Sequence, residues 1–197
     1  LRVEPGESAQ ASKGQAPQKR VIVKPRDLVQ WGLFYPPVVS TATVAGVSPA
    51  MDKAANCAAN GDTACTFDAL EAIPQAQRDA RYHLLSAATL LSVGRVDEAR
   101  KAIDTALQQD AKSSAAYALR AVIAVALNEN EAALSDGRRA VELDPESAAA
   151  KIAVSYALQA NLELAAARDT LLQAVEQEPE NALAWARLAE LHLMLGN

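Results

Sequence analysis

The chain has 197 residues, of which 50% are hydrophobic but only 4% are aromatic, and its formal net charge is −5. This acidic balance, with no basic run longer than a pair such as Lys19-Arg20, argues against a nucleic-acid partner. No apolar run approaches the roughly 20 residues that a membrane-spanning helix needs. A hydrophobic content dominated by alanine instead favours helices that pack at short distance.

Residues 1–46 are predicted to lie outside the helical array. Residues 1–20 are polar and lack periodicity, which is typical of a linker or of the tail of an upstream domain, with a short strand at LRVE. Residues 21–46 form an aromatic and proline-rich connecting segment, in which Asp27 can cap a brief helix that ends before Pro36. Two interpretations of its aromatic cluster stay open, a plug on the first helical pair or a docking motif for another chain. The cluster comprises Trp31, Phe34 and Tyr35.

Residues 47–79 are predicted to be a degenerate, slightly shortened helical repeat. Ser48 as a cap and Pro49 in the first turn favour a helix start, and Gly61 marks the turn to a second helix. Cys57 and Cys65 flank that turn symmetrically, so they face each other in an antiparallel hairpin. They can form a disulfide if their Cα atoms lie within about 7 Å, or stay two buried thiols, depending on the redox compartment. A zinc site is less favoured, because the spacing is not CxxC.

Residues 80–181 repeat with a period of 34 residues and no insertion. The predicted units span 80–113, 114–147 and 148–181, and residues 182–197 are the first helix of another unit. Each full unit reads as two helical runs separated by a turn. Small residues return at fixed positions: Ala87, Ala121, Ser155 and Ala189; Ala99, Ala133 and Ala167; Ala106, Ala140 and Ala174.

This pattern resembles the tetratricopeptide repeat, which has a large residue at position 4, small residues at positions 8, 20 and 27, and proline at position 32. Tyr117 and Trp185 occupy position 4, and the small residues let paired helices approach closely. The resemblance implies an all-α fold, a right-handed α-solenoid of antiparallel helix pairs that follows an extended N-terminal segment. Gly137 stands where a large residue is usual and predicts a thinly packed middle repeat. Lys151, at position 4 of the third unit, is not expected in the core.

The resemblance also implies a concave groove, because the first helix of each pair in this family lines one with positions 2, 5, 9, 12 and 13. The groove is predicted to be largely apolar and to bind an apolar peptide or helix. It can equally be covered by the chain's own residues 21–39 or by downstream helices. The Lys and Asn set that relatives use to clamp acidic C-terminal carboxylates is missing, which excludes that ligand class. The predicted groove residues are Leu84, Leu91, Val122, Val125, Ile152, Tyr156, Gln159 and Glu190.

The stretch VIVKPRDLVQWGLFYPPVVS, joined to downstream repeats, resembles bacterial envelope proteins that pair an upstream FecR-type domain with tetratricopeptide repeats. This second resemblance implies location in the bacterial periplasm or cell envelope. It also implies an interaction or scaffolding role without an established enzymatic activity.

No nucleophile, metal or nucleotide motif stands out in the sequence, so no catalytic residue, metal or cofactor is predicted. His83 and His192 fall at packing positions and are interpreted as core histidines. We therefore expect a non-enzymatic protein-interaction scaffold, with a spacer between a FecR-type domain and a downstream domain as the alternative. The last helix is rich in Leu and Trp and is a poor cap, which predicts that the natural protein continues or that this helix self-associates.

Overall fold

The computed structural model describes residues 7–10, 18–21, 38–39, 44, 46 and 48–196. The proposed docking residues Trp31, Phe34 and Tyr35 lie outside this part of the chain. Strands β1 (Glu7–Gln10) and β2 (Gln18–Val21) pair antiparallel, with Glu7 opposite Val21. The stretch predicted as a linker therefore contains a hairpin. Its polar sequence gives no alternation signal, because a two-stranded ribbon needs no buried face to pair its backbone.

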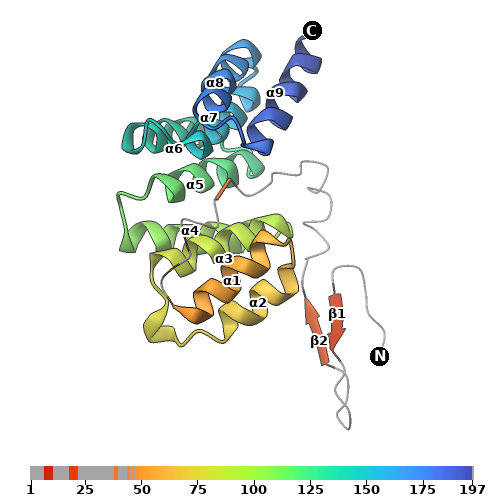
Figure 1. Cartoon of the computed structure of the whole chain (residues 1–197), viewed down its shortest axis with the longest axis vertical. Helices are drawn as coiled ribbons and strands as arrows, with labels where there is room; N and C mark the ends of the chain where they lie inside the picture. The colour runs from red at the N-terminus through yellow and green to blue at the C-terminus, as the bar shows by residue number, and fades with distance from the viewer. Residues whose placement is uncertain are drawn as a thin grey trace.

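The rest of the described chain is a stack of helices (Figure 1). Consecutive helices form pairs, α1 with α2, α3 with α4, α5 with α6 and α7 with α8, and α9 packs on α7 and α8. The predicted all-α solenoid of antiparallel helix pairs is confirmed. The helices are α1 Pro49–Ala59, α2 Thr63–Glu71, α3 Ala80–Ser92, α4 Val96–Gln109, α5 Ser114–Ala126, α6 Asn130–Leu143, α7 Ala148–Ala160, α8 Leu164–Gln177 and α9 Ala182–Leu195, with a 3₁₀ turn at Gln75–Gln77.

The first helix of each pair begins at a side-chain cap. The caps accept hydrogen bonds from backbone N–H groups of the first turn, and such a cap stabilises a helix by about 1 kcal/mol. They are Ser48 for α1, Asp79 for α3, Ser113 for α5 and Ser147 for α7, and Asn181 caps α9 in the same way. The turn to the second helix passes through a residue with positive φ, namely Gly94, Asn128 and Leu162 in successive units. Both features recur at the repeat period, so each pair is built in the same way.

The recurring small residues lie where helices touch. Those of the three full units are at most 1% exposed, as expected where only a β-carbon fits between two helices. Equivalent alanines therefore occupy equivalent surroundings, and the stack rests on their repetition.

The middle repeat is not thinly packed at Gly137, so that prediction is wrong. A β-carbon added to Gly137 would lie 3.0 Å from Cγ2 of Val154, which means that α6 and α7 approach each other closely at this point. Val154 stands at position 7 of the next unit, where the family usually has leucine. The two departures compensate each other across the interface between repeats.

Lys151 is buried, contrary to the sequence-based expectation. Its ammonium group donates hydrogen bonds to the backbone carbonyl of Pro145 and to the side-chain amide oxygen of Gln177. The long aliphatic stem fills the position of the usual large residue, while the charged end reaches polar partners at the ends of α6 and α8.

Arg120 occupies another position where leucine is usual, and it joins three helices. Its guanidinium donates two hydrogen bonds of 2.7 Å to Asp136 on α6 and one of 3.4 Å to Asp104 on α4. The hydrogen bond to Asp136 is the main reason that the pKa of Arg120 is raised above its ordinary value. A planar fork of donors suits this bidentate contact.

The hairpin of α1 and α2 is closed by a disulfide between Cys57 and Cys65, whose Cα atoms lie 5.6 Å apart. Gly61 forms the turn between them with a φ of +70°. The sequence left open whether Cys57 and Cys65 form a disulfide or remain two buried thiols, and the structure contains the disulfide.

Candidate functional site

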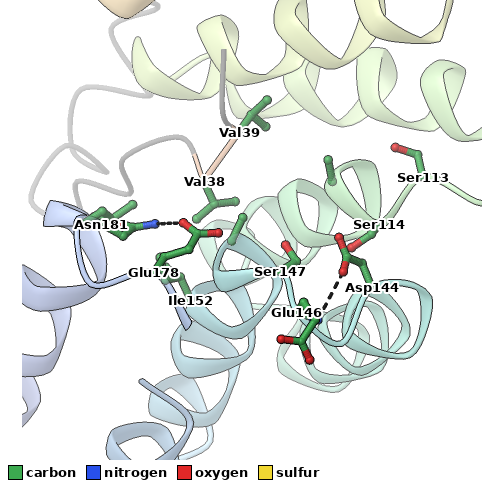
Figure 2. Close-up of a pocket in the computed structure, with 13 residues that line it drawn as sticks. Val38, Val39, Ser113, Ser114, Asp144, Glu146, Ser147, Ile152, Glu178 and Asn181 are labelled. Atoms are coloured by element: carbon green, nitrogen blue, oxygen red, sulfur yellow. Dashed lines mark hydrogen bonds between the residues drawn. The ribbon is translucent and has the colours of Figure 1, made fainter. Parts of the chain in front are cut away.

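The candidate site is a cavity of about 690 Å³ at the N-terminal ends of α5, α7 and α9, which we call the groove cavity (Figure 2). α5 and α7 are the first helices of their pairs, and α9 occupies the same place in the repeat. The predicted groove residues lie on these three helices and on α3. The apolar lining consists of small and aliphatic residues at positions 2 and 5 of the repeat. They are Ala115, Ala149, Ile152 and Leu183.

Two valines of the N-terminal segment complete the groove cavity. Val38 is buried and Val39 is half-buried, and both line the cavity together with the helix residues. Figure 2 shows Val38 close to Ile152 and Glu178. A short piece of the chain itself therefore contacts the surface that the sequence predicted for a ligand.

Val39 also lines a second cavity, of about 370 Å³, on the N-terminal side. The walls of this cavity come from the α1–α2 hairpin and from α3, and include Thr66, Leu85 and Ala88. Val39 thus lines a cavity on the side of the disulfide-closed hairpin as well as the groove cavity, whereas Val38 lines the groove cavity alone of these two.

The rim of the groove cavity is polar and acidic. Its residues are Ser113, Ser114, Ser147, Asn181, Asp144, Glu146 and Glu178, and the described residues of the lining include no lysine or arginine. The carboxylates are held in place, since Glu178 accepts a hydrogen bond from Asn181 Nδ2 at 2.9 Å and Asp144 accepts one from the backbone N–H of Glu146 at 3.2 Å. The cavity combines an apolar floor with a negative edge.

The predicted groove residues differ widely in accessibility. Ile152 lines the groove cavity, but Val122 is 0% and Val125 is 8% exposed, so neither is free to contact a ligand in this structure. Leu84, Leu91 and Tyr156 are also buried. Gln159 is half-buried and Glu190 is exposed. The predicted set is therefore not brought together as one open surface, and its part in binding stays a prediction.

Three predicted groove residues are engaged by one arginine that the sequence reading missed. The Arg187 guanidinium stacks over the Tyr156 ring, with its central carbon 3.9 Å from the ring centroid, and donates hydrogen bonds to Gln159 and Glu190. Arg187 is buried, and its Nε atom has no hydrogen-bond partner among the described residues. Position 6 carries no family preference that would have drawn attention to it.

The two histidines are half-buried rather than core residues, which corrects their interpretation. His83 contacts Tyr82 edge to face, with ring centroids 5.1 Å apart. Burial is the main cause that lowers the pKa of His83, the Arg78 charge lowers it further, and Asp79 opposes both.

Within residues that the structure describes, no three His, Cys, Asp or Glu side chains come together as metal ligands. None of the helices α1 to α9 has both the length and the apolar character that crossing a lipid bilayer requires.

Solved structures share this architecture. A thermophilic TPR protein of Thermus thermophilus is 21% identical with a TM-score of 0.70, and the match covers 77% of this chain and 84% of that one. The first TPR domain of human RPAP3 is 23% identical with a TM-score of 0.54, covering 60% and 94%. The first TPR of Spaghetti (RPAP3), bound to the HSP90 peptide SRMEEVD, is 22% identical with a TM-score of 0.53, covering 61% and 95%. At such identities the likeness shows the fold alone.

No curated protein matches the chain. A family model does match, under the description Tetratricopeptide repeat, over residues 84–148 and 155–197, which together make up more than half of the sequence. With the recurring alanines, the capped first helices and the stacked pairs, this match establishes that the chain belongs to the tetratricopeptide repeat family.

Proposed function

We propose that the chain is a non-enzymatic protein-interaction scaffold that binds an apolar peptide in the groove cavity. The tetratricopeptide fold is typically an interaction scaffold and not an enzyme. The observation that supports the proposal most is the position of Val38, a buried aliphatic side chain seated among residues of the first helices. An apolar side chain on a short non-helical segment therefore fits this surface, and burying it contributes roughly 1.5–3 kcal/mol.

The chemistry of the rim specifies the peptide further. The Asp144, Glu146 and Glu178 carboxylates favour lysine or arginine beside the apolar residues of a ligand and disfavour acidic peptides. The HSP90 peptide SRMEEVD, bound by the Spaghetti repeat domain, has two consecutive glutamates and a terminal aspartate. We do not propose that ligand type here, because the same charges would repel it and because the Lys and Asn clamp set is missing.

The alternative function is a structural spacer whose groove is covered by its own chain. The same valines favour it, since they already contact the surface that a partner would need. In the scaffold proposal a partner displaces Val38 and Val39, whereas in the spacer proposal they are a permanent part of the fold. An upstream FecR-type domain belongs to the spacer proposal and rests on the resemblance of the N-terminal stretch.

One experiment separates the scaffold proposal from the spacer proposal. It removes the two valine side chains from the groove cavity by mutation and then adds the same segment as a free peptide. The variant V38S/V39S is titrated with a fluorescent peptide of residues 36–44, PPVVSTATV, and with the same peptide flanked by lysines. The scaffold proposal expects saturable binding to the variant, weaker binding to the unchanged chain, and tighter, salt-sensitive binding of the lysine-flanked peptide.

The matched control is the peptide PPSSSTATV, which should not bind. Failure of both valine peptides to bind a variant that remains folded by circular dichroism would rule out the peptide groove and leave the spacer.

We further propose location in the bacterial periplasm or cell envelope. Support comes from the FecR-type resemblance and from the Cys57–Cys65 disulfide, a bond that persists in oxidising compartments. Fractionation of the source bacterium with an antibody to this chain tests the proposal, and recovery with the cytosolic marker would contradict it.

A further inference from the structure

The residues just before α1 link the groove cavity to the disulfide-closed hairpin. Those that the structure describes are Val38, Val39, Val44 and Gly46, which we call the valine strap. Val38 lines the groove cavity, and Val39 lines both the groove cavity and the second cavity beside α1, α2 and α3. The valine strap therefore runs from the proposed peptide site to the hairpin.

The hairpin end of the valine strap is held at α1. Val44 is 0% exposed, and the backbone N–H of Gly46 donates a hydrogen bond of 2.6 Å to the carboxylate of Asp52, in the first turn of α1. The chain then continues directly into α1 through its cap, Ser48. Movement of α1 therefore moves this end of the valine strap as well.

The disulfide fixes the shape of one wall of the second cavity. That wall comes from the hairpin, and its residues lie between the two cysteines or next to one of them in the sequence: Ala58, Ala59, Gly61, Thr63 and Thr66. Helices α1 and α2 have only 11 and 9 residues, and isolated helices of this length are marginally stable in water. The bond between Cys57 and Cys65 therefore keeps in place the wall of the cavity that Val39 lines.

The disulfide can be reached from solvent. Cys65 is half-buried, and both cysteines line a surface cavity of about 530 Å³ on the hairpin. A thiolate of a dithiol reductant can attack one sulfur atom there, which forms a mixed disulfide and displaces the other cysteine as a thiolate. The second thiol of the reductant then releases the first cysteine. The pair gains two electrons and two protons, and the reductant leaves as a disulfide.

We propose that reduction of the Cys57–Cys65 disulfide releases the valine strap and thereby opens the groove cavity to an apolar peptide. In the oxidised chain the closed hairpin keeps Val39 in place, so its neighbour Val38 occupies the groove cavity. In the reduced chain the turn of the hairpin loosens, and the two valines no longer compete with a ligand. This inference adds a regulation to the peptide groove, and it rests on the proposed function for the identity of the ligand.

Hydrogen exchange of the full chain, oxidised or reduced with dithiothreitol, tests the release without any ligand. Exchange in the fragment of residues 38–48 should become about tenfold faster on reduction, while α5 and α7 keep their protection. The variant C57S/C65S should exchange at the fast rate without reductant and should not respond to it. An unchanged rate in this fragment on reduction, or an equal rise in α5 and α7, would overturn the proposal.

The variant D52A tests the attachment to α1 independently of redox chemistry. It removes the acceptor of the Gly46 N–H but leaves the disulfide intact, so the fragment of residues 38–48 should exchange faster in the oxidised chain. The matched control E131A removes an exposed acidic residue from the first turn of α6 and should leave this fragment unchanged. Equal exchange rates in the two variants would refute the attachment of the valine strap to α1.

Peptide titration separates this inference from the proposed function. The fluorescent peptide PPVVSTATV should bind the reduced chain about tenfold more tightly than the oxidised chain, and V38S/V39S equally tightly in both redox states. Equal affinities of the oxidised and reduced unchanged chain, with binding to V38S/V39S, would refute the regulation alone. Faster exchange of residues 38–48 on reduction, with no peptide bound by either protein, would refute the proposed function while the release stands.

Discussion

Leu162 carries a local strain that the other repeats avoid. Its φ is +64°, and the equivalent turn residues are Gly94 and Asn128, which are suited to positive φ. A left-handed conformation costs an ordinary residue about 1–2 kcal/mol, and the side chain regains nothing by burial because it is 85% exposed.

We therefore predict that L162N raises the free energy of unfolding by about 1 kcal/mol, measured by urea denaturation. The matched control is L172N, which places asparagine inside α8 and should destabilise the protein. Equal effects of the two substitutions would show that exposed leucine, and not backbone strain, is responsible.

His83 gives the fold a pH dependence. Because its pKa is lowered in the folded chain, mainly by burial, the unfolded chain takes up the proton first as the pH falls. Its contribution to stability is complete above the ordinary value near 6.5 and is lost as the pH falls from there toward the folded-state pKa.

Urea midpoints should therefore fall between pH 7.5 and pH 5, and H83Q should reduce that fall. Titration of the His83 ring by NMR checks the direction independently, and an apparent pKa above 6.5 would contradict the assignment.

At the scale of elements, Arg120 holds α4, α5 and α6 together through Asp104 and Asp136. R120L restores the leucine usual in the family but leaves Asp136, which is only 14% exposed, without its partner. We predict that R120L lowers the free energy of unfolding, measured by urea denaturation, by about 1–2 kcal/mol. The effect is not larger because the arginine is partly exposed and its charge is screened by solvent. R120L/D136L should recover most of it, and an R120L variant more stable than the unchanged chain would disprove this role.

Element positions were predictable from the sequence, because the helices depend on a local pattern. The 34-residue period places the first helices at Ala80, Ser114, Ala148 and Ala182, where the structure begins α3, α5, α7 and α9. The pairing of Gly137 with Val154 was not predictable from positions considered within one repeat, since compensation occurs between neighbours. The position of Val38 in the groove cavity depends on tertiary contacts, which the sequence period does not encode. The burial of Arg187 was not predictable either, because position 6 of the repeat has no characteristic residue type.

At the scale of the whole molecule, each pair contacts mainly its neighbours, so local loosening should stay local. Reduction of the Cys57–Cys65 disulfide is predicted to speed amide exchange in α1 and α2 while α5 to α8 keep their protection. Hydrogen exchange followed by mass spectrometry, with and without reductant, measures this. Uniform loss of protection along the chain would mean that the array unfolds as one unit.

The same bond has a mechanical consequence for a chain that is held by its two ends. A pull on the molecule cannot extend the eight-residue spacing between Cys57 and Cys65, so full extension is shorter by about 20 Å than for the reduced chain. Under force, the disulfide keeps the turn between α1 and α2 closed even after the other helix pairs have unfolded.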